Sequence, residues 1–157
     1  MRRSEVDETT IASYLPPLAM ELFRAMPYYD QQHALKVVET LRRQGYHDPD
    51  LIAAALLHDV GKSVSLAGRP RLWHRVATVL GHAFWPDLLE RLSREDQGEG
   101  WRQPFYVQEH HAALGAQLAQ EAGCSPVTES LIRHHEEPGS ESDDPWLAAL
   151  QAADSTN

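Results

Sequence analysis

The spacing of hydrophobic residues predicts helices throughout the chain and gives no convincing alternating strand pattern. Residues 31–44 carry an apolar stripe at helical spacing, whereas residues 49–60 are apolar almost all round. A helix of the second kind has no face suited to water, so it should run through the middle of the core. We therefore expect an all-α fold, a single compact bundle of about six to eight helices.

Proline, glycine and capping residues predict where these helices begin and end. Asp48-Pro49 and Ser125-Pro126 each have the form of an N-cap followed by a first-turn proline. We expect Asp30 to cap the helix over 31–44, and Gly45 and Gly61 to end the helices that precede them. Pro16-Pro17 should interrupt a helix over about 10–25. The remaining predicted helices cover 68–84, 86–93, 104–122, 126–137 and 145–154.

Composition and charge narrow the class of protein. A chain of 157 residues predicts one domain over 1–157, with residues 1–27 as a helical extension packed on the core. The net charge of −9 argues against broad nucleic-acid binding. No apolar run is long enough to span a bilayer, so we expect no membrane association. One cysteine, Cys124, and no recognisable signal peptide favour a cytoplasmic location.

Nine histidines are the feature that composition leaves unexplained. Several of them, with two aspartates, fall on inward faces of the predicted helices, and a buried polar group needs a partner. Imidazole and carboxylate without thiolate suit iron, manganese, cobalt or zinc. Because an aspartate has two oxygens, it can bridge two ions while an adjacent histidine holds one of them. The candidate ligands are His33, His58, Asp59, His111, His134, His135 and Asp154.

The order of these residues resembles the HD-domain superfamily of metal-dependent phosphohydrolases. His33, then His58-Asp59 followed by Val-Gly-Lys, then Asp154 is similar to that superfamily's His…His-Asp…Asp signature, and the resemblance covers about residues 28–157. The resemblance implies an HD-domain bundle in which His33, His58, Asp59 and Asp154 surround one ion. It further implies that His111, His134 and His135 hold a second ion, bridged by Asp59.

The segments that carry the extra histidines are similar to the HD-GYP group, with differences. His111 and Gly115 match its His-Pro-x-x-Gly helix, but Ala112 replaces the proline, and the Gly-Tyr-Pro segment is missing after His135. Cleavage of cyclic dinucleotides is therefore not inferred. Adjacent helical residues point about 100° apart. Which member of His110/His111 and of His134/His135 is a direct ligand therefore stays open, although His111 is favoured over His110.

A cationic segment follows the His-Asp pair in this acidic chain. Its basic residues are Lys62, Arg69, Arg71 and Arg75, and no acidic residue lies between Lys62 and Pro86. Arginine grips a phosphate in forked geometry and lysine acts as a point charge, so these residues are candidates for substrate binding. Lys62 is the preferred one, because the resemblance implies that the equivalent lysine reaches the substrate.

The expected function is hydrolysis of a nucleotide or another small phosphoester by a metal-activated hydroxide. Asp59 and Lys62 are the expected catalytic residues. The cofactor is expected to be one or two divalent transition metal ions, Fe or Mn first, with Co, Zn, Ni or Mg as alternatives. Two other hypotheses stay open, an HD-fold di-iron oxygenase and a non-catalytic ligand-sensing module. The sequence does not decide the oligomeric state, and a homodimer remains an alternative to a monomer.

Overall fold

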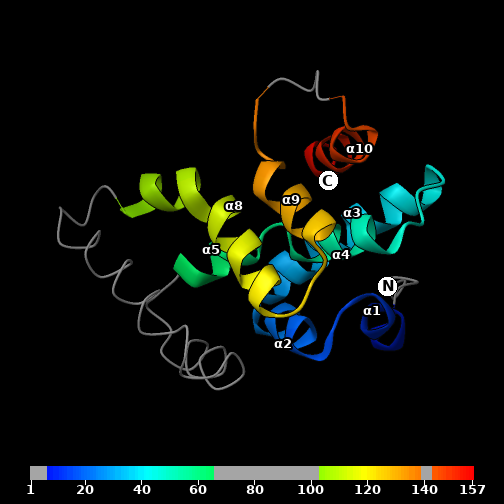
Figure 1. Cartoon of the computed structure of the whole chain (residues 1–157), viewed down its shortest axis with the longest axis horizontal. Coiled ribbons are helices and arrows are strands. Elements are labelled where there is room, and N and C mark those ends of the chain that lie inside the picture. The colour runs from blue at the N-terminus through cyan, green and yellow to red at the C-terminus, as the bar shows by residue number, and fades with distance from the viewer. Residues whose placement is uncertain (1–6, 66–102, 139–142) are drawn as a thin grey trace.

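The computed structural model describes residues 7–65, 103–138 and 143–157, and all regular structure in these ranges is helical (Figure 1). The expected all-α fold is confirmed. Every residue of helix α4, Pro49–Leu57, from Leu51 onward is at most 3% exposed. This helix contacts α1 (Glu8–Tyr14), α2 (Pro17–Ala25), α3 (Tyr28–Arg43), α9 (Pro126–His134) and α10 (Pro145–Ser155). The helix that is apolar all round is therefore the central one, as its sequence predicts.

Two short helices at the N-terminal end pack against this centre. Helix α1, Glu8–Tyr14, is capped by Asp7, which accepts a hydrogen bond from the Thr10 backbone. Helix α2, Pro17–Ala25, begins directly after Pro16, so the two prolines separate the helices as expected. Both contact α4, and α2 also contacts α5, Val60–Ser65. No helix among the described residues is long and apolar enough to cross a membrane.

Helix α3, Tyr28–Arg43, starts earlier than predicted. Asp30 is not its cap, because the chain turns into the helix directly after Pro27, whose φ of −53° is close to helical. Asp30 lies in the first turn instead, where a carboxylate still favours the helix dipole. The C-terminal prediction is confirmed: Gly45 follows the helix with φ of 89°, a conformation that favours glycine.

Gly61 does not end a helix, and that prediction was wrong. Helix α4 ends at Leu57 with His58 as its C-cap, and a second short helix, α5, spans Val60–Ser65 with Gly61 inside it. A Cβ atom at Gly61 would lie 1.9 Å from the carbonyl oxygen of His111 and 2.9 Å from the nitrogen of Gly115. The missing side chain therefore allows α5 to lie directly on the backbone of α8, Gln103–Glu121.

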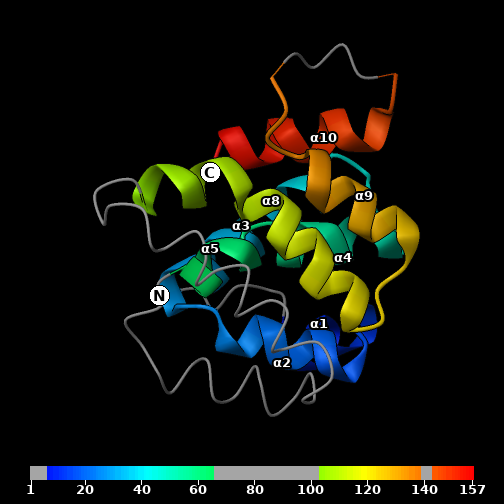
Figure 2. The same cartoon turned by 60° about the vertical axis from the view of Figure 1, so that its left-hand side comes forward.

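Three further helices of the described residues, all after residue 102, surround this contact. Helix α8, Gln103–Glu121, packs on α5 and α9, and α10, Pro145–Ser155, lies against α3, α4 and α9 (Figure 2). Helix α9, Pro126–His134, is capped by Ser125 as predicted. The Ser125 hydroxyl also donates to Asp50 Oδ1 at 2.7 Å, which ties the start of α9 to the start of α4.

Candidate metal centre

Within the described part of the chain, four histidines and three carboxylates from several helices and helix ends meet beside the central helix. They form two groups in which each residue offers one donor atom within 4.8 Å of the others. His33 lies on α3, His58 and Asp59 follow α4, His111 lies on α8, His135 and Glu136 follow α9, and Asp154 lies on α10. Residues more than 100 positions apart in the chain are thus brought together by the helix packing.

The first donor group consists of His33, His58 and Asp154. Oδ1 of Asp154 lies 2.8 Å from Nε2 of His33 and 3.3 Å from Nε2 of His58. His58 is fully buried, whereas the side chains of His33 and Asp154 are partly exposed. The group therefore lies at the edge of the core.

The second donor group consists of Asp59, His111, His135 and Glu136. Nε2 of His111 lies 3.1 Å from Oε1 of Glu136, and Nε2 of His135 lies 3.9 Å from the same oxygen. Both imidazole nitrogens lie 3.9 Å from Oδ1 of Asp59. The histidines and Asp59 are buried, whereas the Glu136 side chain is 38% exposed.

Asp59 faces both groups with different oxygens. Its Oδ2 lies 3.6 Å from Nε2 of His58 and 4.0 Å from Nε2 of His33. Its Oδ1 is the oxygen directed to His111 and His135. The carboxylate therefore lies between the two groups in the way a bridging ligand requires.

The imidazole rings form a continuous row through the cluster. Ring centroids are 5.3 Å apart for His33 and His58, 5.2 Å for His58 and His135, and 5.6 Å for His135 and His111. Nδ1 of His58 contacts the Ala55 carbonyl at 2.8 Å, and Nδ1 of His135 contacts the Ile132 carbonyl at 2.6 Å. Because a carbonyl oxygen only accepts hydrogen bonds, both Nδ1 atoms carry a hydrogen. In the neutral ring, Nε2 then carries a lone pair, and this lone pair is directed into the cluster.

Burial and charge affect the two groups differently. Burial lowers the pKa of His58, but the Asp154 and Asp59 carboxylates outweigh burial and raise this pKa above its ordinary value. Burial, together with the neighbouring His58, lowers the pKa of His135 to about 4. Burial raises the pKa of Asp154, but His58 and His33 outweigh burial and hold this pKa well below its usual range.

Among the residues that the structure describes, Lys62 brings a cation to the cluster. Its Nζ lies 2.8 Å from Oδ1 of Asp59 and 4.0 Å from Oε1 of Glu136, and its side chain is 42% exposed. Burial raises the pKa of Asp59, but His58 and Lys62 together outweigh it and lower this pKa. Asp59 is therefore ionised at neutral pH, as a metal ligand must be.

These residues fit a divalent metal ion. Nε2 of His135 is buried and has no hydrogen-bond partner among the described residues, although its Nδ1 is fully bonded. A buried nitrogen without a partner is costly unless something binds it. Imidazole and carboxylate donors suit transition metals such as iron, manganese and zinc, and do not by themselves select one.

The structure brings together every predicted ligand except His134. His134 is 38% exposed, its Nδ1 donates to the Ser130 carbonyl at 2.7 Å, and its Nε2 lies 3.8 Å from Glu137. Neighbouring helical residues point about 100° apart, so His135 faces the cluster while His134 faces outward. His111 is buried and faces the cluster, whereas the side chain of His110 lies outside the described part of the chain.

Glu136 was not among the predicted ligands. It follows the end of α9, where helical periodicity no longer indicates direction, and it begins an acidic stretch that is most simply interpreted as a solvated connection. The sequence signal that could have indicated Glu136 as a ligand was its position directly after His134-His135. Lys62 lies at the cluster, whereas Arg69, Arg71 and Arg75 lie outside the described residues.

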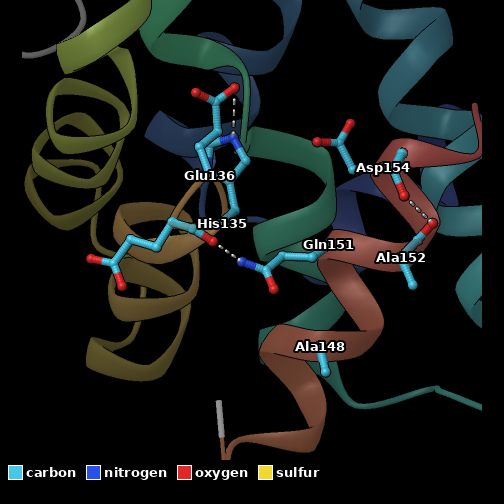
Figure 3. Close-up of a pocket in the computed structure, with 8 residues that line it drawn as sticks. His135, Glu136, Ala148, Gln151, Ala152 and Asp154 are labelled. Atoms are coloured by element: carbon cyan, nitrogen blue, oxygen red, sulfur yellow. Dashed lines mark hydrogen bonds and ion pairs between the residues drawn. The ribbon is translucent and has the colours of Figure 1, made fainter. Parts of the chain in front are cut away.

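An open pocket of about 730 Å³ adjoins the cluster between the end of α9 and α10 (Figure 3). His135, Glu136 and Asp154, which belong to the donor groups, also line this pocket. Gln151 forms part of its wall and donates to the Glu137 carbonyl at 3.1 Å. Both donor groups therefore have members at a surface open to solvent.

Comparison of the chain with protein-family models, with curated proteins and with solved structures gave no match.

Proposed function

We propose that this protein is a metal-dependent phosphohydrolase of the HD-domain type, acting on a nucleotide or another small phosphoester. The observation that carries the proposal is the pair of donor groups joined by Asp59, with one carboxylate oxygen directed to each. The order His33, His58-Asp59, Asp154 along the chain, similar to that of HD domains, supports it independently.

The two donor groups would hold the ions. His33, His58 and Asp154 would hold one, and His111, His135 and Glu136 the other, with Asp59 between them. When bound, such ions make water a nucleophile at neutral pH and neutralise charge on a phosphoryl group. Fe and Mn are the ions to test first, with Co, Zn, Ni and Mg as alternatives, because imidazole and carboxylate donors admit several divalent ions.

The residues of the chain then orient the substrate. Asp59 is held ionised by His58 and Lys62, and the half-exposed Lys62 ammonium lies within reach of a substrate that enters the cluster. An ammonium donates to phosphate oxygens as a point charge. Arg69, Arg71 and Arg75 follow shortly in the sequence and are proposed as further phosphate ligands. The pocket lined by Glu136, Gln151 and Asp154 offers space beside the reacting phosphoester.

The decisive experiment compares Asp59→Ala with the unchanged protein. We expect the variant to lose bound metal and phosphate release together, measured by elemental analysis and by hydrolysis of a panel of nucleotides and small phosphoesters with Mn²⁺ or Fe²⁺. Asp143→Ala removes an exposed carboxylate and is the matched control, expected to keep both properties. Hydrolysis retained by Asp59→Ala at unchanged metal content would contradict the proposal.

An oxygenase is the second candidate, because four imidazoles with a shared carboxylate also suit a pair of iron ions. The same preparation, loaded anaerobically with iron, distinguishes the two reactions. Oxygen consumption with a substrate would favour the oxygenase, and phosphate release with several divalent ions favours hydrolysis. A protein that holds no metal after growth in metal-rich medium would favour a non-catalytic module.

A further inference from the structure

Lys62 contacts the same carboxylate oxygen that a second ion needs. Its Nζ lies 2.8 Å from Oδ1 of Asp59, the oxygen that is directed to His111 and His135. It also lies 4.0 Å from Oε1 of Glu136, the other carboxylate of the second donor group. An ammonium ion therefore lies beside both anionic donors of this group.

The first donor group is surrounded differently. Its carboxylate, Asp154, pairs with His33 and His58, whose nitrogens are themselves metal donors. A divalent ion that bound there would contact the carboxylate without displacing an ammonium from it. In the second group, an ion that bound Oδ1 of Asp59 would lie next to the positive charge of Lys62, and like charges at such a distance repel.

The charges of the cluster also favour ion binding at the first donor group over ion binding at the second. The two groups contain three carboxylates, those of Asp59, Glu136 and Asp154, and Lys62 lies among them. One divalent ion in the first group, together with the Lys62 ammonium, would balance these three negative charges. A second divalent ion would leave two positive charges in excess with the ammonium in place, and one if the ammonium turned outward. Because the Lys62 side chain is 42% exposed, it has solvent to turn into.

We propose, on the basis of the metal centre proposed above, that the Lys62 ammonium competes with a metal ion for Asp59 Oδ1, so that the two donor groups differ in affinity. The first group binds a divalent ion tightly. The second group holds the lysine ammonium until a second ion displaces it. Lys62 is thus the residue that sets the occupancy of the second group.

The test is a Mn²⁺ titration of the full chain after chelation, with free Mn²⁺ counted by its electron paramagnetic resonance signal. The unchanged protein should bind one ion tightly and a second ion at least about tenfold more weakly. Lys62→Met should tighten the second ion at least about tenfold and leave the first nearly unchanged. Lys62→Gln removes the same charge with a different side chain and should act alike.

Two variants control for effects unrelated to the charge at Asp59. Lys62→Arg keeps a cation and should keep the second ion weak. Lys36→Met removes an exposed lysine of α3 and should leave both affinities unchanged. Circular dichroism verifies that each variant retains its helices.

The possible results separate this inference from the proposal on which it rests. Two equally tight ions in the unchanged protein, or a second affinity that Lys62→Met and Lys62→Gln leave unchanged, would overturn the competition while keeping the metal centre. Binding of no ion by the unchanged protein would overturn the metal centre, and the competition with it.

Discussion

The two donor groups share Asp59 and the same kinds of side chain, but their surroundings differ. In the first group, the Asp154 oxygen lies 2.8 and 3.3 Å from its two imidazole nitrogens. In the second group, the Glu136 oxygen lies 3.1 and 3.9 Å from its two imidazole nitrogens, and Lys62 contacts Oδ1 of Asp59, the oxygen directed to this group. We therefore expect the two groups to differ in metal affinity although their residue types are alike, because neighbouring charge and spacing differ.

The two groups also depend on different contacts of the fold. The first is built by α3, α10 and the end of α4, which pack on one another in the core. The second depends on α5 and α8, which approach closely because Gly61 has no side chain, and on Glu136, which follows a helix end. A change in one set of contacts should therefore affect one donor group more than the other.

Removing one histidine from either group gives the largest expected difference between the metal affinities of the two groups. His33→Ala should weaken the first ion at least about a hundredfold, as loss of a direct ligand exceeds the effect of losing an outer partner. His135→Ala should weaken the second ion instead. Calorimetric titration with Mn²⁺ measures both affinities. If each variant weakened both ions equally, the division into two groups would be contradicted.

Gly61→Ala tests the packing that positions the second group. The new Cβ would lie 1.9 Å from the His111 carbonyl oxygen, so α5 and α8 must separate. We expect a loss of about 1–3 kcal/mol in the free energy of unfolding, measured by urea denaturation. The second ion should weaken more than the first.

Gly115→Ala is the matched control for this packing change. Its Cβ would meet its nearest neighbour at 3.2 Å, which small shifts relieve, and alanine favours a helix over glycine. The loss of stability should therefore be smaller than for Gly61→Ala. A larger loss from Gly115→Ala would count against the close contact at Gly61.

Proton binding should distinguish the groups in the chelated protein. The pKa of His135 is lowered to about 4 in the folded protein, so this histidine binds a proton more weakly in the folded state than in the unfolded state. Its contribution to the stability of the fold therefore decreases as the pH falls from 6.5 to about 4. The raised pKa of His58 acts oppositely: its contribution is present below 6.5 and is lost as the pH rises through that pKa. Imidazole NMR at pH 5.5 should show His58 charged and His135 neutral; the reverse order would contradict the assignment.

The adjacent histidines at the end of α9 give the smallest expected effect. His134→Ala removes an exposed side chain whose ring contacts Ser130 and Glu137. The number and affinity of bound ions should stay unchanged, and stability should change by no more than about 0.5 kcal/mol. Loss of the second ion in this variant would show that His134 turns inward on binding.

Much of the fold follows from local sequence signals. The apolar stretch Leu51–Leu57 predicts the central helix, and Asp48 and Ser125 predict helix starts, because capping depends on neighbouring residues alone. Gly61 was misread because its role lies in a contact with His111, fifty positions away in the chain. Such a contact leaves no local pattern.

The candidate site was predictable where its residues lie on regular helices. His33, His111 and Asp154 could be placed by helical periodicity. Glu136 could not, because it follows the end of α9, and periodicity left His134 and His135 undecided for the same reason. The salt bridge between Lys62 and Asp59 spans one helical turn, but its consequence for a second ion depends on α8 and α9.

The most direct test of the account is an anomalous difference map from crystals of this protein grown in saturating Mn²⁺. The account predicts one peak among His33, His58 and Asp154 and a second among His111, His135 and Glu136, both next to Asp59. A map that lacks a peak at one or both donor groups would contradict the proposed metal centre.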